Sequence, residues 1–252
     1  MAGHSHWAKI KRAKASSDAK KGQIWSKLAR KIIVAARTGG GNPADNLQLR
    51  YAIEEARAAN MPKDTIENAI KKGTGEVGST NYEHIMYEGY GPGGAAVMVE
   101  CLTDNRNRTA PELRKIFERA GGQLGSTNCV AWMFTQKGIF TVPADAISED
   151  ELIEICLDAG ADDVRKEGDV YEITSQVSDF TKVKDALTAK GVELIQAEIA
   201  MVPNNTVSLE PEKARQVISL VETLEEHDDV QKVFSNLDIP DELAAELEKT
   251  LG

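Results

Sequence analysis

Residues 82–102 read YEHIMYEGYGPGGAAVMVECL and decide the fold class. Two runs that favour strands, Tyr82–Tyr90 and Ala95–Leu102, flank the turn Gly91-Pro92-Gly93-Gly94. Strand-like runs separated by a short turn rich in Gly and Pro predict a β-hairpin. Before residue 81 the apolar residues repeat with a helical period. The chain is therefore expected to change from helices to mixed helix and strand at this point.

The first 73 residues are predicted to form four helices. The second extends from about Gln23 to Arg37, with apolar residues in one arc and cations in the opposite arc. The third covers about residues 44–59, and the fourth begins at Pro62. We expect the fourth to end at Gly73, because glycine is preferred just past a helix end. These helices predict a bundle.

Mixed helix and strand follow the hairpin. A helix is predicted at about residues 110–120, because Thr109 and Glu112 have the spacing of a capping box. Strands are predicted at residues 130–134 and 139–142. Starting with the strand at residues 139–142, the order is strand, helix, strand, strand, helix, strand, which is ferredoxin-like. The five elements after that first strand are expected at residues 149–159, 162–166, 170–174, 179–189 and 193–201.

The last fifty residues are predicted to complete an earlier domain. They contain a strand at residues 206–209, a helix at 211–227, a strand at 230–234 and an acidic helix from Asp241. So short a stretch cannot bury its own apolar faces. We therefore predict an α plus α+β multidomain protein, with an N-terminal helical bundle followed by two α+β domains, one inserted in the other. The expected domains are residues 1–77, the discontinuous 78–136 plus 203–252, and the ferredoxin-like insert 137–202.

Charge is distributed unevenly along the chain. The 252 residues carry a net charge of −10, yet residues 1–37 hold ten Lys and Arg and one acid. Residues 146–252 hold nine basic and 26 acidic residues. Such asymmetry is typical of a basic arm that meets phosphates. The three widely spaced cysteines and the lack of an 18-residue apolar run favour a cytoplasmic protein without a membrane partner.

The basic N-terminal run gives the first candidate binding residues. Each Lys or Arg that meets a phosphate releases condensed counterions, which drives association. A solvated basic face and a mitochondrial transit peptide are the alternatives. Cations on the second helix lie off its apolar arc, so we expect the bundle to fold without them. The candidates are Lys9, Lys11, Arg12, Lys14, Lys20, Lys21, Lys27, Arg30, Lys31 and Arg37.

Residues 104–109 give a second candidate site, read as DNRNRT between a strand and a helix. Arg106 and Arg108 could hold a phosphate backbone or a folded RNA edge, because free amides at a helix start favour anions. They could equally form an internal network with nearby carboxylates. The pattern favours neither interpretation.

The sequence contains no motif that predicts an enzyme, a cofactor or a metal site. The glycine patterns at residues 73–78 and 89–94 lack the strand before and the helix after that a nucleotide site needs. The ferredoxin-like order is also that of an RNA-recognition module, in which Phe140 and Tyr171 would stack on bases. The insert is acidic, however, so we expect both rings in a core.

Several long motifs in this chain resemble those of the YebC family. They are MAGHSHWAKIK at residues 1–11, GGGNP at 39–43, NMP at 60–62, YEGYGPGG at 87–94 and LTDNRNRT at 102–109. Arg12, Trp25 and Asn128-Cys129 depart from the usual family residues. The family includes bacterial proteins described as probable transcriptional regulators and the mitochondrial translational activator of cytochrome c oxidase. The resemblance implies a three-domain, cytoplasmic, non-enzymatic protein that binds nucleic acid.

Charge and resemblance together predict a regulator of gene expression. The first expectation is a DNA-binding transcriptional regulator that docks through its basic N-terminal helices. The alternative is a factor bound to ribosomal RNA that assists translation of difficult stretches, such as runs of proline. The acidic domains would then face solvent or a protein partner, such as polymerase or ribosomal proteins.

Overall fold

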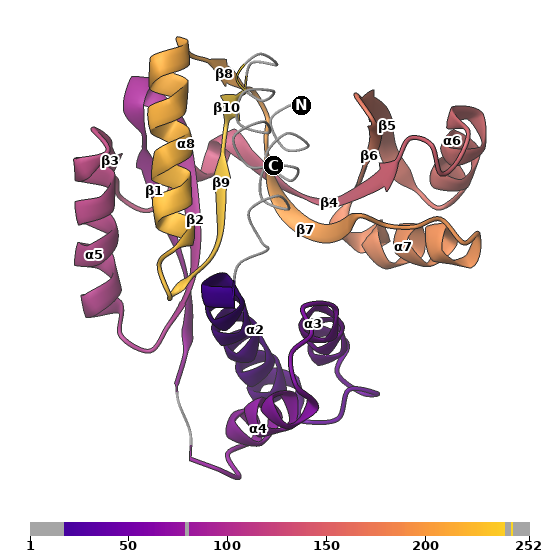
Figure 1. The fold of residues 1–252 in the computed structure, drawn as a ribbon, viewed down its shortest axis with the longest axis horizontal. Coiled ribbons are helices and arrows are strands. Elements are labelled where there is room, and N and C mark those ends of the chain that lie inside the picture. Colours follow the sequence, from indigo (N-terminus) through magenta and orange to yellow (C-terminus); the bar gives the residue numbers. More distant parts are fainter. Residues whose placement is uncertain (1–17, 79–80, 240–242, 244–252) are drawn as a thin grey trace. The chain divides into compact units, whose positions relative to one another are not determined.

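The computed structural model describes residues 18–78, 81–239 and 243. These residues divide into two compact units, whose elements are labelled in Figure 1. The helix–sheet unit comprises the described residues up to Val130 together with 212–235. The ferredoxin-like unit comprises residues 131–211 and the described residues from Asn236 onward. The three domains predicted from the sequence divide the chain more finely, and their boundaries stay a prediction.

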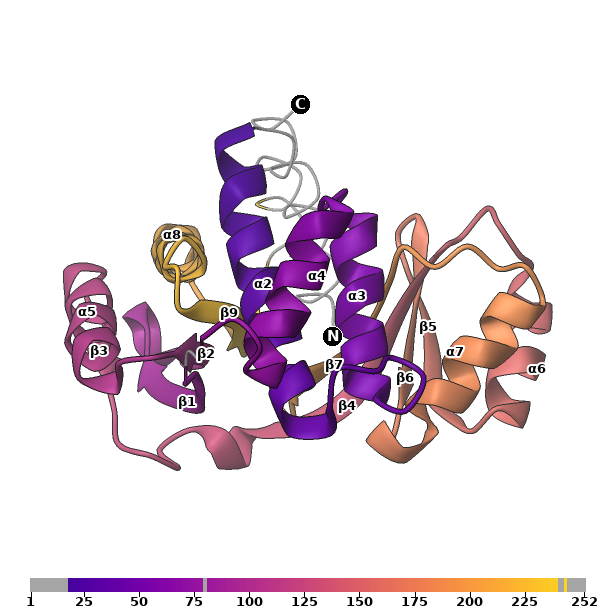
Figure 2. The ribbon, with the colours of Figure 1, turned by 90° about the horizontal axis from the view of Figure 1, so that it is seen from below.

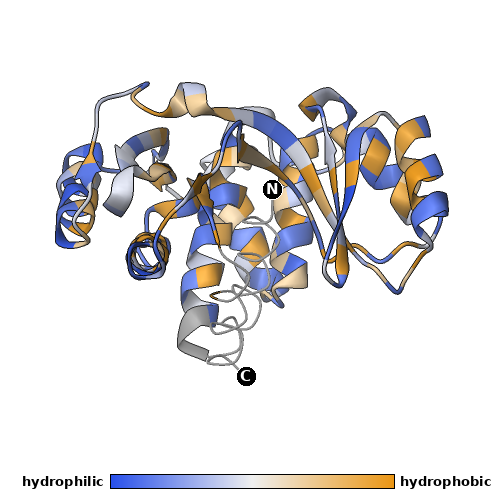
Figure 3. Ribbon diagram, turned by 90° about the horizontal axis from the view of Figure 1, so that it is seen from above, coloured by the Kyte–Doolittle hydropathy of each residue, from blue (hydrophilic) through white to orange (hydrophobic). Residues whose placement is uncertain are grey.

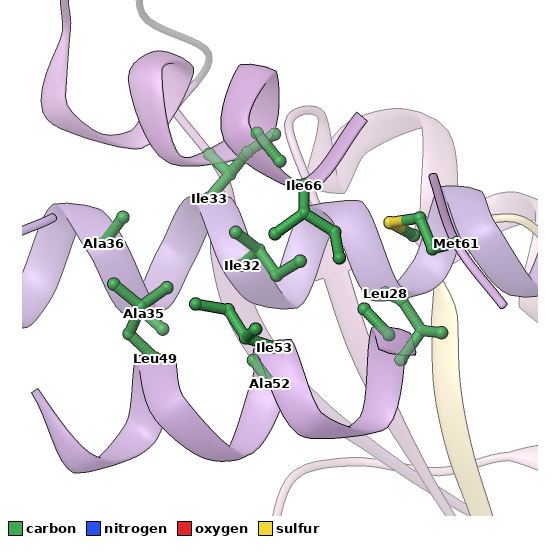
Figure 4. Close-up of a cluster of buried hydrophobic side chains, with 12 residues drawn as sticks. Leu28, Ile32, Ile33, Ala35, Ala36, Leu49, Ala52, Ile53, Met61 and Ile66 are labelled. Carbon is green, nitrogen blue, oxygen red and sulfur yellow. The ribbon is translucent and has the colours of Figure 1, made fainter. Parts of the chain in front are cut away.

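Three helices form the amino-terminal part of the helix–sheet unit, and the predicted first helix lies outside the described residues. They are α2 (Asp18–Gly39), α3 (Leu47–Ala58) and α4 (Lys63–Thr74). Their apolar arcs meet in one buried cluster around Ile32 (Figure 4). Asn46 holds the loop before α3: its Oδ1 accepts from the Leu49 amide at 3.0 Å, and its Nδ2 donates to the Ala35 carbonyl at 2.8 Å.

Gly73 has a different role from the predicted one. Helix α4 continues through it and stops at Gly75, which has the left-handed φ of 85° that a helix end favours. Gly73 is buried inside the helix, where a Cβ would lie 2.6 Å from both the Ala36 Cβ and the Ile33 carbonyl oxygen. The absent side chain thus lets α4 pack closely on α2.

The predicted hairpin is confirmed and forms the centre of a four-stranded sheet. Strands β1 (Glu83–Tyr90) and β2 (Ala96–Thr103) pair antiparallel, and the sheet order is β3-β1-β2-β9. The short β3 (Gln123–Leu124) pairs with β1, and β9 (Val230–Ser235) pairs with β2. The late segment therefore completes a sheet that begins at Glu83, before the whole ferredoxin-like unit in the chain. Helices α5 (Arg106–Arg119) and α8 (Pro211–Glu225) lie on one face of this sheet (Figures 1 and 2).

Helix α5 starts earlier than predicted. Asn105 caps it, with its Oδ1 accepting from the Arg108 amide at 3.2 Å. The proposed capping box at Thr109 and Glu112 is wrong, because Thr109 lies inside the helix and is buried. Its hydroxyl donates instead to the Asp229 carboxylate at 2.7 Å. The helix start is thus set by the loop before it, and Thr109 belongs to a tertiary network.

The ferredoxin-like order is confirmed in the second unit. Its sheet has the order β5-β6-β4-β7 with every pair antiparallel. The predicted strands at 130–134 and 139–142 are wrong in one respect: they form a single strand, β4, after a short 3-10 turn at Ala131–Met133. The elements in chain order are β4 (Phe134–Pro143), α6 (Glu149–Asp158), β5 (Ala161–Glu167), β6 (Val170–Ser175), α7 (Phe180–Ala189) and β7 (Gln196–Pro203). A two-stranded parallel pair, β8 (Val207–Ser208) and β10 (Leu237–Asp238), completes the unit.

Phe140 and Tyr171 lie in the core of the ferredoxin-like unit, as expected. Both side chains are buried, and the Phe140 ring stacks on Phe180 of α7 with centroids 4.9 Å apart. Figure 3 shows the amphipathic character of α6 and α7, which carry hydrophobic residues beside hydrophilic ones. Because both rings pack between the sheet and its helices, neither is available to stack on a base.

We predict opposite effects of alanine at two glycines of the helical part. Gly73→Ala should destabilise the protein by about 1–3 kcal/mol, because the new methyl overpacks the α2–α4 contact. Gly22→Ala in α2, where a new Cβ would meet no atom within 4 Å apart from the local helix backbone, should stabilise it by about 0.5–1 kcal/mol. Urea unfolding of both variants measures this difference, and equal effects would show that α4 does not pack closely on α2.

Candidate nucleic-acid interface

The predicted cations of the N-terminal run fall into two groups. Lys9, Lys11, Arg12 and Lys14 lie outside the described residues. Lys20 and Lys21 lie in the first turn of α2, and Lys21 is exposed. The remaining four, Lys27, Arg30, Lys31 and Arg37, lie further along α2, and each contacts an acceptor of the protein itself. The structure therefore does not bring all ten together on one open face.

Lys27 and Arg30 contact the last residue of α8 and the turn that follows it. The Lys27 ammonium donates to the Glu225 carbonyl, and the Arg30 guanidinium donates to the Asp228 carbonyl. The last carbonyls of a helix have no partner within the helix, and cations there also complement the helix dipole. These two side chains thus tie α2 to the end of α8. Both side chains lie off the apolar arc of α2, so the sequence pattern did not predict that they would have this structural role.

Arg37 and Lys31 are held by other neighbours. Arg37 donates to the side chain of Asn81 and, at 2.6 Å, to the Tyr82 carbonyl, which fixes the segment leading into β1. Lys31 pairs with Glu55 of α3 at 2.7 Å. Both partners of that pair are partly exposed, so it contributes at most about 1 kcal/mol to stability.

Asp229 is the centre of the contacts between α2, α5 and the sheet. Its side chain is 2% exposed and lies 2.8 Å from the Arg108 guanidinium and 3.3 Å from that of Arg30. Its carboxylate also accepts from the hydroxyls of Thr103 at 3.1 Å and Thr109 at 2.7 Å. Burial alone would raise the pKa of Asp229, but the hydrogen bonds from Arg108, Thr109 and Thr103 lower it. The residue is thus a charged anchor at neutral pH.

Arg108 takes the internal role that the sequence left open. It pairs with Asp229 and, at 3.1 Å, with Asp104. Asn105 is used as the helix cap, so much of the DNRNRT loop serves the fold. Arg106 differs, because its side chain is exposed and forms no hydrogen bond or ion pair with another described residue. Of the two arginines in this loop, one builds the structure and the other remains open to a ligand.

A cleft of about 480 Å³ lies beside this network. His227 and Glu112 face one another across 2.9 Å in its wall. Four carboxylates against two guanidinium groups give the cleft no excess of positive charge, so it does not suit a phosphate. Its lining residues are Gln23, Arg30, Arg108, Glu112, Glu226, His227, Asp228 and Asp229.

Asp229 and the remaining cations of α5 were not among the residues predicted from the sequence. Asp229 is one of four acids between residues 225 and 229, and nothing in its local sequence distinguishes the buried one. The cations of α5 could have been found, because every Lys and Arg between residues 79 and 130 lies in that helix. Arg114, Lys115 and Arg119 join Arg106 as exposed cations there.

Comparisons with known proteins cover nearly the whole chain. A family model described as the TACO1/YebC protein N-terminal domain matches residues 5–76, and one described as the TACO1/YebC second and third domain matches residues 82–237. A protein of Pelotomaculum thermopropionicum named "Probable transcriptional regulatory protein" is 55% identical over 96% of this chain and 100% of its own length. A protein of Dictyoglomus turgidum with the same name is 51% identical over 98% of this chain and 100% of its own length.

A solved structure shares the fold. The crystal structure of the conserved hypothetical protein Aq1575 from Aquifex aeolicus superposes with a TM-score of 0.82 and 48% sequence identity. The match covers 90% of this chain and 94% of that one. In the part of the chain described here, no helix has the length and hydropathy needed to cross a membrane.

Replacing the buried anchor should destabilise the protein strongly. Asp229→Asn keeps the size of the side chain but leaves Arg30 without its charge partner, and we expect a loss of about 3 kcal/mol. The matched control is Asp104→Asn, which removes a partner of the same Arg108 at a half-exposed position and should change stability by less than about 0.5 kcal/mol. Urea unfolding at neutral pH distinguishes the two, and similar values would refute the anchor role.

The same anchor predicts an acid-sensitive fold. Because the folded pKa of Asp229 is lowered, its contribution is present above the ordinary Asp pKa of about 3.9 and is lost as pH falls through the folded value. The free energy of unfolding of the natural protein should therefore fall more steeply below about pH 4 than that of Asp229→Asn. A constant difference between the two proteins from pH 7 to pH 2.5 would contradict this.

Proposed function

Because the chain belongs to the TACO1/YebC family, whose relatives are named probable transcriptional regulatory proteins, we propose that it regulates gene expression without catalysis by binding a nucleic-acid backbone. The proposed contact lies in the basic N-terminal part of the chain, and duplex DNA is the first candidate ligand. Binding is dominated by phosphates rather than bases, because the whole chain has only 13 aromatic residues to stack on bases.

The observation that carries this proposal is the separation of charge. The described residues 18–78 contain eleven Lys and Arg against seven Asp and Glu. Residues 1–17 add four cations, Lys9, Lys11, Arg12 and Lys14, and no acid. Residues 131–211 contain six basic residues against sixteen acidic ones. A polyanion is attracted to the first region and repelled by the second, which orients the protein and limits unspecific binding.

The internal contacts of α2 narrow the proposed surface. Lys27 and Arg30 are engaged by the turn after α8, and Arg37 by the segment before β1. The binding role therefore rests mainly on the cations up to Lys21. Lys27 and Arg30 contribute by fixing α2 to the rest of the helix–sheet unit.

A second candidate is an RNA-bound translation factor. The resemblance to the mitochondrial translational activator favours it, and phosphate electrostatics treat both polymers alike. For a translation factor, the ligand is ribosomal RNA and the acidic ferredoxin-like unit faces ribosomal proteins. For a DNA-binding regulator, that unit faces polymerase or solvent.

We predict a steep salt dependence of binding. If about five phosphates are neutralised, the logarithm of the association constant should fall with the logarithm of salt concentration at a slope of about −4 to −5. Fluorescence anisotropy with a duplex DNA and with a structured RNA, each from 50 to 300 mM salt, measures the slope and tells which polymer binds more tightly. A weak affinity for both DNA and RNA that does not change with salt concentration would contradict the proposal.

Cation replacements locate the contact. The variant Lys9→Gln, Lys11→Gln, Arg12→Gln and Lys14→Gln should make the slope less steep by about 3 to 4, since each phosphate contact contributes about 0.9. The comparison is Lys63→Gln, Lys71→Gln and Lys72→Gln in α4, which removes exposed cations from a helix outside the proposed contact. Equal effects of both sets would mean that net charge alone governs binding.

A further inference from the structure

The two faces of the ferredoxin-like sheet differ in character. Helices α6 and α7 pack on the same face, where Phe140 and Ile173 belong to the buried cluster (Figures 1 and 2). Successive side chains of a strand point to opposite faces. Thr141 and Glu172 are the chain neighbours of these two residues and pair with each other, so they lie on the opposite face. We call that opposite face of the sheet the polar face.

The polar face carries an excess of carboxylates. Four lie on its strands against two cations, Lys137 and Arg165. Each cation is already paired with a carboxylate, Lys137 with Asp162 at 3.3 Å and Arg165 with Asp163. The charge that remains on this face is therefore negative. The four carboxylates belong to Asp163, Glu167, Glu172 and Glu198.

Glu172 lies in the middle of the polar face, on the inner strand β6 between Arg165 of β5 and Thr141 of β4. It is 4% exposed, and its side chain forms no hydrogen bond or ion pair with another described residue. Burial raises the pKa of this carboxyl to about 7. A buried carboxylate is stable in its charged form only when a cation or hydrogen-bond donors replace the lost water. The ionised form of Glu172 thus needs a further cation.

Residues 1–17 match the polar face in charge and in length. They hold four cations and no acid, whereas the cations in the middle of α2 already have protein acceptors. Fully extended, the stretch from Lys9 to Lys14 spans at most about 18 Å. The outer strands of a four-stranded sheet lie about 14 Å apart, because neighbouring strands are about 4.8 Å apart. One such stretch is therefore long enough to place cations over all four strands.

We propose that the basic segment of residues 1–17 docks on the polar face of its own chain when no nucleic acid is bound, and that Glu172 receives one of its cations. This inference rests on the proposed function, because the segment that docks is also the one that binds phosphates. The same cations cannot contact both surfaces, so docking lowers the affinity for nucleic acid. A duplex displaces the segment because its phosphates release condensed counterions when they are neutralised.

The first experiment tests the contact directly on the full chain. A water-soluble carbodiimide joins a carboxylate to a lysine amine only where the two touch, and mass spectrometry of the monomer identifies the joined peptides. We expect links from Lys9, Lys11 or Lys14 to Glu167 or Glu198, and their loss when duplex DNA is added. The absence of such links overturns the proposal. Links in a cell lysate from the polar face to a basic partner protein, and none to residues 1–17, also overturn it.

The second experiment measures the effect of docking on affinity. The variant Glu167→Gln, Glu172→Gln and Glu198→Gln keeps the size of three side chains and removes their charge. If the segment is docked in about nine molecules of ten, the affinity for duplex DNA should rise about tenfold, because the apparent dissociation constant is the intrinsic value divided by the competent fraction. The variant Glu167→Gln and Glu198→Gln leaves the buried Glu172 unchanged and should shift the affinity in the same direction.

The matched control removes three exposed glutamates from α6, a helix on the other face of the sheet. At about 150 mM salt, Glu149→Gln, Glu151→Gln and Glu154→Gln should raise the affinity by less than about twofold, because charges more than about 8 Å apart are largely screened. An unchanged affinity in both polar-face variants, or an equal rise in the control, refutes docking while the proposed function stands. If the natural protein binds neither duplex DNA nor structured RNA, the proposed function fails, and the crosslinks alone decide whether the segment docks.

Discussion

The buried carboxylate of Asp229 is the interaction on which the arrangement of the helix–sheet unit depends. It lies in the turn between α8 and β9 and receives the guanidinium groups of Arg30 and Arg108 together with two threonine hydroxyls. A buried charge is tolerated only when it is paired and its lone pairs are hydrogen-bonded. Because both conditions are met, one side chain fixes α2, the start of α5 and the end of β2 relative to one another.

This network divides the basic residues into two kinds. Those in the middle of α2 and at Arg108 stabilise the protein, because carboxylates and helix-end carbonyls already hold them. Lys21 of α2 and four cations of α5, which are Arg106, Arg114, Lys115 and Arg119, are instead exposed. A simple count of positive charges in the sequence would give both kinds the same role. Only the tertiary contacts separate cations that build the fold from cations that lie exposed at the surface.

Local patterns predicted most of the fold. The hairpin at residues 82–102 and the ferredoxin-like order were predictable because strand periodicity and turn residues are local signals. The errors occurred where a distant contact overrides the local signal. Gly73 was expected to end a helix but instead allows close packing on Ala36, and Thr109 was expected to cap a helix but instead bonds to Asp229. The same limit explains why the candidate site was only partly predictable, since its anchor lies 120 residues from Thr109 in the chain.

The most direct test of the account maps where the protein touches nucleic acid. Ultraviolet crosslinking in cells, followed by mass spectrometry of nucleotide-bearing peptides, identifies the contact residues, and sequencing of the attached strands identifies the polymer. We expect adducts on peptides from residues 1–21, and few on residues 137–203. Adducts concentrated in the acidic ferredoxin-like unit, or their absence from every peptide, would contradict it.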